Sequence, residues 1–221
     1  MNVVLAILWK DLVTEWRSRE RLGAMLAFAL LVVIVFHFAL PEGTASGIGD
    51  NAAGLLWVAY VFAALLGLGR SFAQELENDA LAGLALAPAD RGAVFAGKAL
   101  ASFVVTGGVE AVVAAAFALV FGLDLRPVAL PLAGVVALGT AGICSVGTLL
   151  SAMAVRTRFR ELLLPILLLP ALLPVLAGAV RGTAAAIAGE GIPFEALQLL
   201  VVIDGIYVTV SYLVFEYVLD E

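Results

Sequence analysis

The stretch Leu22–Leu40, LGAMLAFALLVVIVFHFAL, decides the fold class. It contains no Asp, Glu, Lys or Arg, and its only titratable side chain is His37. A helix rises 1.5 Å per residue, so a run of this length crosses the roughly 30 Å hydrocarbon core of a bilayer. Arginines at 17, 19 and 21 precede the run, and Pro41 follows it. We therefore expect residues 22–40 to form a transmembrane helix.

The rest of the chain repeats this pattern. Of the 221 residues, 63% are hydrophobic, and the mean hydropathy is +1.12. A soluble domain has about 45–50% apolar residues. We predict an all-α integral membrane protein, a single transmembrane domain over residues 1–221. Its six transmembrane helices cover about 22–40, 52–69, 99–121, 128–155, 162–180 and 196–219.

The distribution of basic residues orients these helices. Ten of the twelve Lys and Arg residues fall in segments that six spans would place on one side, and two, Arg126 and Arg181, fall on the other. Lys and Arg concentrate in cytoplasmic loops. We predict a multi-pass protein of the cytoplasmic (inner) membrane with both termini in the cytoplasm. The alternative concerns the fifth run, in which Pro165, Pro170 and Pro174 favour a broken or re-entrant helix.

The N-terminal segment, residues 3–17, is predicted to be an interfacial helix. Its apolar residues recur every three or four positions, so they share one helical face; they are Leu5, Leu8, Trp9, Leu12 and Trp16. Two tryptophans beside basic residues are typical of a helix lying at the surface of a bilayer. A plain cytoplasmic start to the first span is the alternative.

The longest cytoplasmic loop, Arg70–Lys98, contains a second amphipathic pattern. Asp79 is placed to cap a short helix that Pro88 would end. The residues that give this loop its apolar and acidic faces are Phe72, Glu75, Leu76, Glu77, Asp79, Leu81 and Leu84. Such an apolar face needs a bilayer surface or the groove of a partner to cover it. A solvated connector is the alternative.

Two carboxylates, Glu110 and Asp204, fall inside predicted spans. A charge at membrane depth is costly, so such groups usually face the interior of a helix bundle. Each is predicted to make a structural hydrogen bond between helices, with substrate binding or proton relay as the alternative. His37, at the outer end of the first span, is more plausible as an interfacial side chain than as a heme contact, because heme iron would need a second ligand or a partner.

Several classes of function have no support in the sequence. There is no Gly-rich phosphate loop, no Gly-x-Ser-x-Gly and no metal-binding motif. We therefore expect neither an enzyme nor a metal or nucleic-acid site. Any ATP hydrolysis that drives this protein must take place in another chain.

The order of these elements resembles a type-2 ABC-transporter permease, and particular motifs resemble the heme exporter protein B (CcmB) family of cytochrome c maturation. They are Gly54-Leu-Leu-Trp-Val-Ala59, Arg70-Ser-Phe72, Leu162-Leu-Leu-Leu-Pro165, Leu173-Pro-Val-Leu-Ala-Gly178 and Phe215-Glu-Tyr-Val-Leu-Asp-Glu221. Asp204 and Ser211 in the sixth span also fit. The family's usual Asp-Gly-(Thr/Ser)-Leu-Glu reads Asn78-Asp-Ala-Leu-Ala82 here, which leaves the details of ATPase docking open.

The resemblance implies a permease that forms a homodimer, binds a separate ABC ATPase through the loop after the second span, and works with a heme-handling membrane protein. Heme is then a candidate substrate, with no cofactor bound directly. Two alternatives stay open: a type-2 ABC permease that exports a drug, lipid or polysaccharide, and a membrane protein without ATP coupling, such as a channel or an assembly factor.

Overall fold

The computed structural model describes residues 3–40, 45–77, 90–155, 157 and 159–218, with the backbone alone at 45–50, 72–77, 160 and 161. These residues form seven helices and no strand. The helices are α1 (Val3–Ser18), α2 (Glu20–Ala39), α3 (Ala45–Glu77), α5 (Arg91–Phe121), α6 (Ala129–Ala154), α7 (Arg160–Ile187) and α8 (Phe194–Val218).

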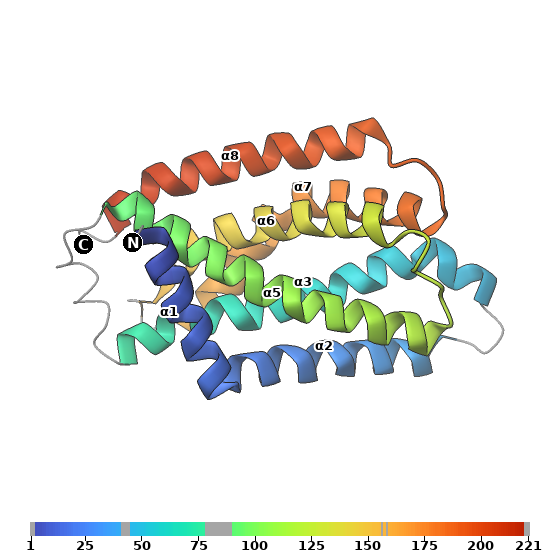
Figure 1. The fold of residues 1–221 in the computed structure, drawn as a ribbon, viewed down its shortest axis with the longest axis horizontal. Coiled ribbons are helices and arrows are strands. Elements are labelled where there is room, and N and C mark those ends of the chain that lie inside the picture. Colours follow the sequence, from blue (N-terminus) through green and yellow to red (C-terminus); the bar gives the residue numbers. More distant parts are fainter. Residues whose placement is uncertain (1–2, 41–44, 78–89, 156, 158, 219–221) are drawn as a thin grey trace.

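Six of these helices, all but α1, are long and apolar enough to cross a membrane, as predicted. They lie side by side along the length of the molecule, and α1 crosses one end of the bundle at a steep angle (Figure 1). Val3 of α1 and Val218 of α8 pack on the same small cluster of buried residues, so the first and last helices meet at that end. An even number of spans explains why they meet.

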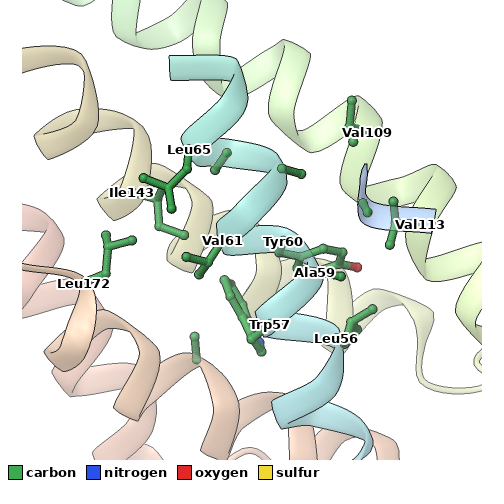
Figure 2. Packing of buried hydrophobic residues seen from close by; sticks show 14 of the residues in the cluster. Leu56, Trp57, Ala59, Tyr60, Val61, Leu65, Val109, Val113, Ile143 and Leu172 are labelled. Carbon is green, nitrogen blue, oxygen red and sulfur yellow. The ribbon is translucent and has the colours of Figure 1, made fainter. Parts of the chain in front are cut away.

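The core follows from helical spacing. Buried residues recur every three or four positions, so each helix turns one stripe inward. On α5 the stripe is Val105, Val109, Val113 and Phe117, and on α7 it is Leu164, Leu168, Leu172, Val175 and Ala179. The central helix is α3, the most buried of the six spans. Trp57 and Tyr60 extend from neighbouring turns of α3 among residues of α5, α6 and α7 (Figure 2).

Glycines on α6 let other helices come close. A methyl group at Gly139 would meet the ring of Trp57, and one at Gly147 would meet Leu68, both on α3. At Gly142 it would meet the carboxylate of Asp204 on α8. Gly134 has open space around it. Helix association in a bilayer depends on such close contacts, because lipid tails are as apolar as the helices.

The helix bounds extend beyond the predicted spans at both ends of the bundle: α3 begins at Ala45 rather than at 52, and α7 ends at Ile187 rather than at 180. Larger differences lie at the end that α1 crosses, here named the basic end because most Lys and Arg residues belong to it. The second span, α3, extends to Glu77, and α5 begins at Arg91 rather than at Ala99. Asp90 caps α5, since its carboxylate accepts a hydrogen bond of 3.1 Å from the backbone N–H of Gly92. Lys98, which the sequence places in a loop, is therefore a helical residue.

The fifth span is one continuous helix, so the broken or re-entrant alternative is wrong. Pro165, Pro170 and Pro174 all lie inside α7. Each proline lacks the backbone N–H that would bond to the carbonyl four residues earlier. In a membrane protein, groups on neighbouring helices can satisfy such a carbonyl. The hydroxyl of Tyr207 on α8 donates to the carbonyl of Ala171, within this proline-rich stretch.

Candidate functional site

The main polar site lies around Glu110, in the middle of α5. Its side chain is 1% exposed. Glu110 Oε2 is 2.5 Å from Thr140 Oγ1 on α6, and the hydroxyl of Tyr60 on α3 donates to the backbone carbonyl of Glu110 at 3.1 Å. Three helices are thus joined at one point. This contact is the hydrogen bond between helices that the sequence predicts for Glu110.

A cavity of about 870 Å³ lies beside this site, between α5 and α6. It extends along α5 from Phe103 to the turn at Asp124 and Arg126, and Tyr60, Glu110 and Thr140 form part of its wall. Most of the remaining wall consists of Ala, Gly, Leu and Val. Ligand sites in proteins have similar volumes, with apolar walls and a few polar groups. The cavity therefore extends from the turn between α5 and α6 to Glu110.

Asp204, the second intramembrane carboxylate, lies apart from Glu110 on α8. It is 9% exposed, and Oδ1 lies against Gly142 of α6. Neither carboxylate oxygen has a hydrogen-bond partner among the described residues. The two carboxylates therefore occupy different surroundings, and only Glu110 has the hydrogen bond between helices that was predicted for both.

The inner face of α1 is held to the bundle by carboxylates. Asp11 Oδ2 lies 2.8 Å from Lys98 Nζ on α5, and the Lys98 side chain is 2% exposed. One turn later, Glu15 Oε2 lies 3.7 Å from an Arg21 guanidinium nitrogen at the start of α2, and both side chains are buried. Glu15 Oε1 also accepts a hydrogen bond of 3.0 Å from the backbone N–H of Leu22.

The opposite face of α1 is apolar and exposed. Trp9 is 69% exposed and Trp16 is 71% exposed, and the guanidinium of Arg19 lies 5.5 Å from the ring centre of Trp16. Tryptophan with a neighbouring arginine suits the headgroup region of a bilayer. The structure thus turns Leu5, Trp9 and Trp16 of the predicted apolar stripe away from the protein and leaves them available to lipid, whereas Leu12 packs against the main core.

The structure describes only some of the amphipathic residues that the sequence predicts for the longest cytoplasmic loop. Phe72, Glu75, Leu76 and Glu77 lie on the last turns of α3, where the backbone alone is described. Asp79, Leu81 and Leu84 lie outside the described residues. An exposed salt bridge of 3.6 Å between Arg70 and Glu20 joins this part of α3 to the start of α2.

His37 lies at the other end of the bundle. Its ring packs edge-on against Phe38 and Phe121, with ring centres 5.5 and 5.8 Å apart. The described residues contain no group of three or more His, Cys, Asp or Glu side chains that could hold a metal ion. The position of His37 fits an interfacial aromatic contact between α2 and α5.

Sequence reasoning missed the ion pairs of α1 and the partners of Glu110. The sequence pattern assigns Lys98 to the loop before the third span, so it does not predict a buried cation inside α5. The spacing of Ile7, Asp11 and Glu15 was the available signal, because residues four apart share a helical face. Thr140 and Tyr60 gave no signal of their own, since both lie in long apolar runs.

Comparison with known proteins identifies the family. The model of the family described as CcmB protein matches residues 2–218. Heme exporter protein B of Rhodobacter capsulatus is 37% identical over 172 residues, which cover 77% of this chain and 78% of the relative. The protein of the same name from Paracoccus denitrificans is 38% identical over 185 residues, or 81% and 83% of the two chains.

A third relative, heme exporter protein B of Pseudomonas aeruginosa, is 29% identical over 176 residues, covering 79% of this chain and 78% of its own. The matches extend over most of both partners, as expected for proteins of one architecture. Together with the six membrane helices, they show that this chain is a multi-pass membrane protein that belongs to the CcmB family.

Proposed function

We propose that this chain is the membrane permease subunit of an ABC-type complex for cytochrome c maturation. In this role it couples ATP hydrolysis by a separate chain to the delivery of heme or to the release of a heme-loaded chaperone. The observation that carries the proposal is membership of the CcmB family, whose compared relatives are named heme exporter protein B. The chain itself has no nucleotide-binding motif, so the energy must come from a partner.

The basic end of the bundle is the proposed docking side for the ATPase. The C-terminal turns of α3 and the loop Ser71–Pro88 carry the amphipathic pattern, and α1 crosses the same end of the molecule (Figure 1). The positive-inside rule assigns this end to the cytoplasm, where ATP is available. In this arrangement α1 lies in the cytoplasmic membrane interface, with Trp9 and Trp16 among the lipid headgroups.

The proposed complex contains a second copy of this chain, an ATPase and a heme-handling membrane protein. The spans leave apolar surface for such contacts: α8 is the least buried of the six, and the side chains of Val201, Leu213 and Tyr217 are more than half exposed. Lipid covers any part of this surface that no partner covers.

Copurification tests the proposal. The tagged chain should retain an ABC ATPase from solubilised membranes, and its deletion should abolish c-type cytochromes. Leu76→Asp and Leu81→Asp should each uncouple ATP hydrolysis from cytochrome maturation, while the subunit still inserts. Gly191→Asp is the matched control at the opposite end of the bundle, where no other heavy atom lies within 4 Å of an added Cβ atom. Normal complex formation and cytochrome yield in both leucine variants would place the docking site elsewhere.

The second candidate is a type-2 ABC permease that exports a lipid, drug or polysaccharide. The apolar cavity between α5 and α6 favours it, because its walls suit an aliphatic molecule better than a charged one. Deletion separates the two candidates. Loss of c-type cytochromes supports the first, whereas normal cytochromes with a defect in an exported lipid or glycan support the second.

A further inference from the structure

A line of buried polar side chains, here named the polar seam, follows the contact between α5 and α6. On α5 its residues recur at every fourth position, and on α6 at every third or fourth. None is more than 4% exposed. The polar seam consists of Lys98, Ser102, Thr106 and Glu110 on α5 and Thr140, Cys144, Thr148 and Ser151 on α6.

The register of the two helices places these residues opposite one another. A short turn joins α5 to α6, so the helices are antiparallel neighbours, and Glu110 contacts Thr140. Moving four residues back along α5 and four forward along α6 brings Thr106 level with Cys144, and both side chains are buried. The same steps bring Ser102 level with Thr148, and Lys98 level with Ala152, the residue after Ser151. Phe95 and Val155 continue this register and share one buried cluster.

Several polar atoms of the seam lack a protein partner. Thr106 Oγ1, Glu110 Oε1, Thr148 Oγ1 and Ser151 Oγ are buried and make no hydrogen bond with the described residues. A buried polar group without a partner costs about 1–3 kcal/mol. Residues four apart on a helix are separated by about 6 Å, a gap that one water molecule can bridge with two hydrogen bonds of about 2.8–3.0 Å. The spacing of the seam residues therefore fits a single row of bridging water molecules.

Both ends of the seam lead out of the core. At Glu110 and Thr140 it meets the cavity that extends to the turn at Asp124 and Arg126. At the other end, about 18 Å away along α5, Lys98 pairs with Asp11 of α1. Arg21, which pairs with Glu15, lies beside Gly67 of α3. The titratable groups that contact seam residues from other elements are Tyr60 of α3 and Asp11 of α1, and the pair of Glu15 with Arg21 lies one turn further along α1.

The contacts of Thr140 indicate where a transferable proton resides. Thr140 Oγ1 is 2.8 Å from the carbonyl oxygen of Val136 and 2.5 Å from Glu110 Oε2. A threonine hydroxyl has one hydrogen, and in a helix it commonly donates to the carbonyl four residues earlier. The contact with Glu110 then needs a second hydrogen, which a neutral carboxylic acid supplies. Glu110 Oε1 is left as an acceptor.

We propose that the polar seam passes protons between Glu110 and the end of the bundle that α1 covers. The Glu110 carboxylic acid gives its proton to a neighbouring hydroxyl or water, and each group along the seam accepts one proton and releases another. The last proton goes to water beside Lys98 and Asp11. Glu110 is left as a carboxylate, and the reverse transfer restores the acid without any oxidant or reductant. This inference does not rest on the proposed role in heme handling, and either can fail alone.

Infrared spectroscopy of the full-length protein in liposomes tests the proposal, with D2O as the probe. The carbonyl band of the protonated Glu110 should shift when D2O replaces H2O and should be missing in Glu110→Gln, which assigns it. Thr106→Val removes one hydroxyl of the seam at nearly constant shape. It should slow the exchange by roughly three- to twentyfold, the equivalent of a membrane hydrogen bond. Thr106→Ser should restore the rate, and Thr209→Val, at an exposed position of α8, should leave it unchanged.

Three results would overturn the proposal. If no carbonyl band depends on Glu110, the residue is ionised and holds no proton to pass. If the Thr106→Val and Thr209→Val variants exchange at the same rate, the seam is not the route. If Ala115→Phe, which narrows the cavity, slows exchange while Thr106→Val does not, protons reach Glu110 from the cavity alone. Val112→Phe, on a lipid-exposed face of α5 outside the cavity wall, is the size control for that variant.

Discussion

Removing the Asp11 carboxylate should cost much more stability than removing its partner Lys98. In Asp11→Asn the Lys98 ammonium loses this partner while its side chain is 2% exposed. In Lys98→Met the Asp11 carboxylate remains, but it is 14% exposed and lies 3.1 Å from the Lys10 ammonium. The asymmetry follows because losing an ion-pair partner costs more for a buried ammonium than for a carboxylate near the surface, which keeps a second cation and water.

The magnitudes follow from burial. Breaking a buried ion pair from one side costs about 3–5 kcal/mol. We expect about 3 kcal/mol for Asp11→Asn, the lower end of that range, because Asp11 is partly exposed. This corresponds to more than about a hundredfold in the unfolding equilibrium. Lys98→Met should cost about 1 kcal/mol, since Met replaces the aliphatic stem and the remaining carboxylate behaves as a surface charge.

Reversible unfolding in mixed micelles measures these differences. The double variant Asp11→Asn with Lys98→Met should be more stable than Asp11→Asn alone, because it removes the buried charge as well as its partner. Lys10→Met is the control, because this lysine is 47% exposed and its pair with Asp11 should contribute less than about 1 kcal/mol. Additive effects of the two substitutions, or equal costs for Asp11→Asn and Lys10→Met, would refute the reasoning.

Three further predictions can be checked separately. Gly139→Ala should destabilise the protein by about 1–3 kcal/mol in the same unfolding assay, because its methyl group meets the Trp57 ring, whereas Gly134→Ala should be neutral or slightly stabilising. Glu110→Gln should keep normal stability and Glu110→Ala should lose roughly 0.6–2 kcal/mol, and equal losses would show that the hydrogen bond to Thr140 contributes nothing. Reporter fusions should be outside after Glu42, Asp124 and Glu190 and inside after Asp90, Arg158 and Glu221; an outside reporter after Glu221 would contradict six crossings.

The six spans could be predicted because a bilayer imposes one strong rule. Every backbone polar group in the hydrocarbon core must be satisfied within its own segment, so a long apolar run has to be a helix. The run at residues 22–40 matches α2 (Glu20–Ala39) almost residue for residue. The rule fixes where a helix must cross but does not fix where it ends. This is why α5 starts at Arg91 and includes Lys98, well before the predicted span.

The proline-rich run shows a second limit of local sequence rules, because they predict an interruption that the helix does not have. Three prolines predict an interrupted helix when the segment is considered alone. In the structure α7 is continuous and packs against other helices along its length. Tyr207 of α8, more than thirty residues later in the chain, donates a hydrogen bond to Ala171 between the second and third prolines. No pattern within residues 160–187 could have indicated it.

The two intramembrane carboxylates illustrate what spacing alone leaves undecided. Glu110 and Asp204 look alike in the sequence, since each is a single acid in an apolar run. What distinguishes them is the neighbouring position on α6. Glu110 faces Thr140, whose hydroxyl can share a proton with it, whereas Asp204 faces Gly142, which offers no side chain. On α5, Lys98, Ser102, Thr106 and Glu110 lie four residues apart, and they share one buried face because the helix starts at Arg91 and includes Lys98. A single buried acid is compatible with a structural role, but a row of polar residues on one buried face of a membrane helix is harder to explain by structure alone, because each hydroxyl without a partner lowers stability.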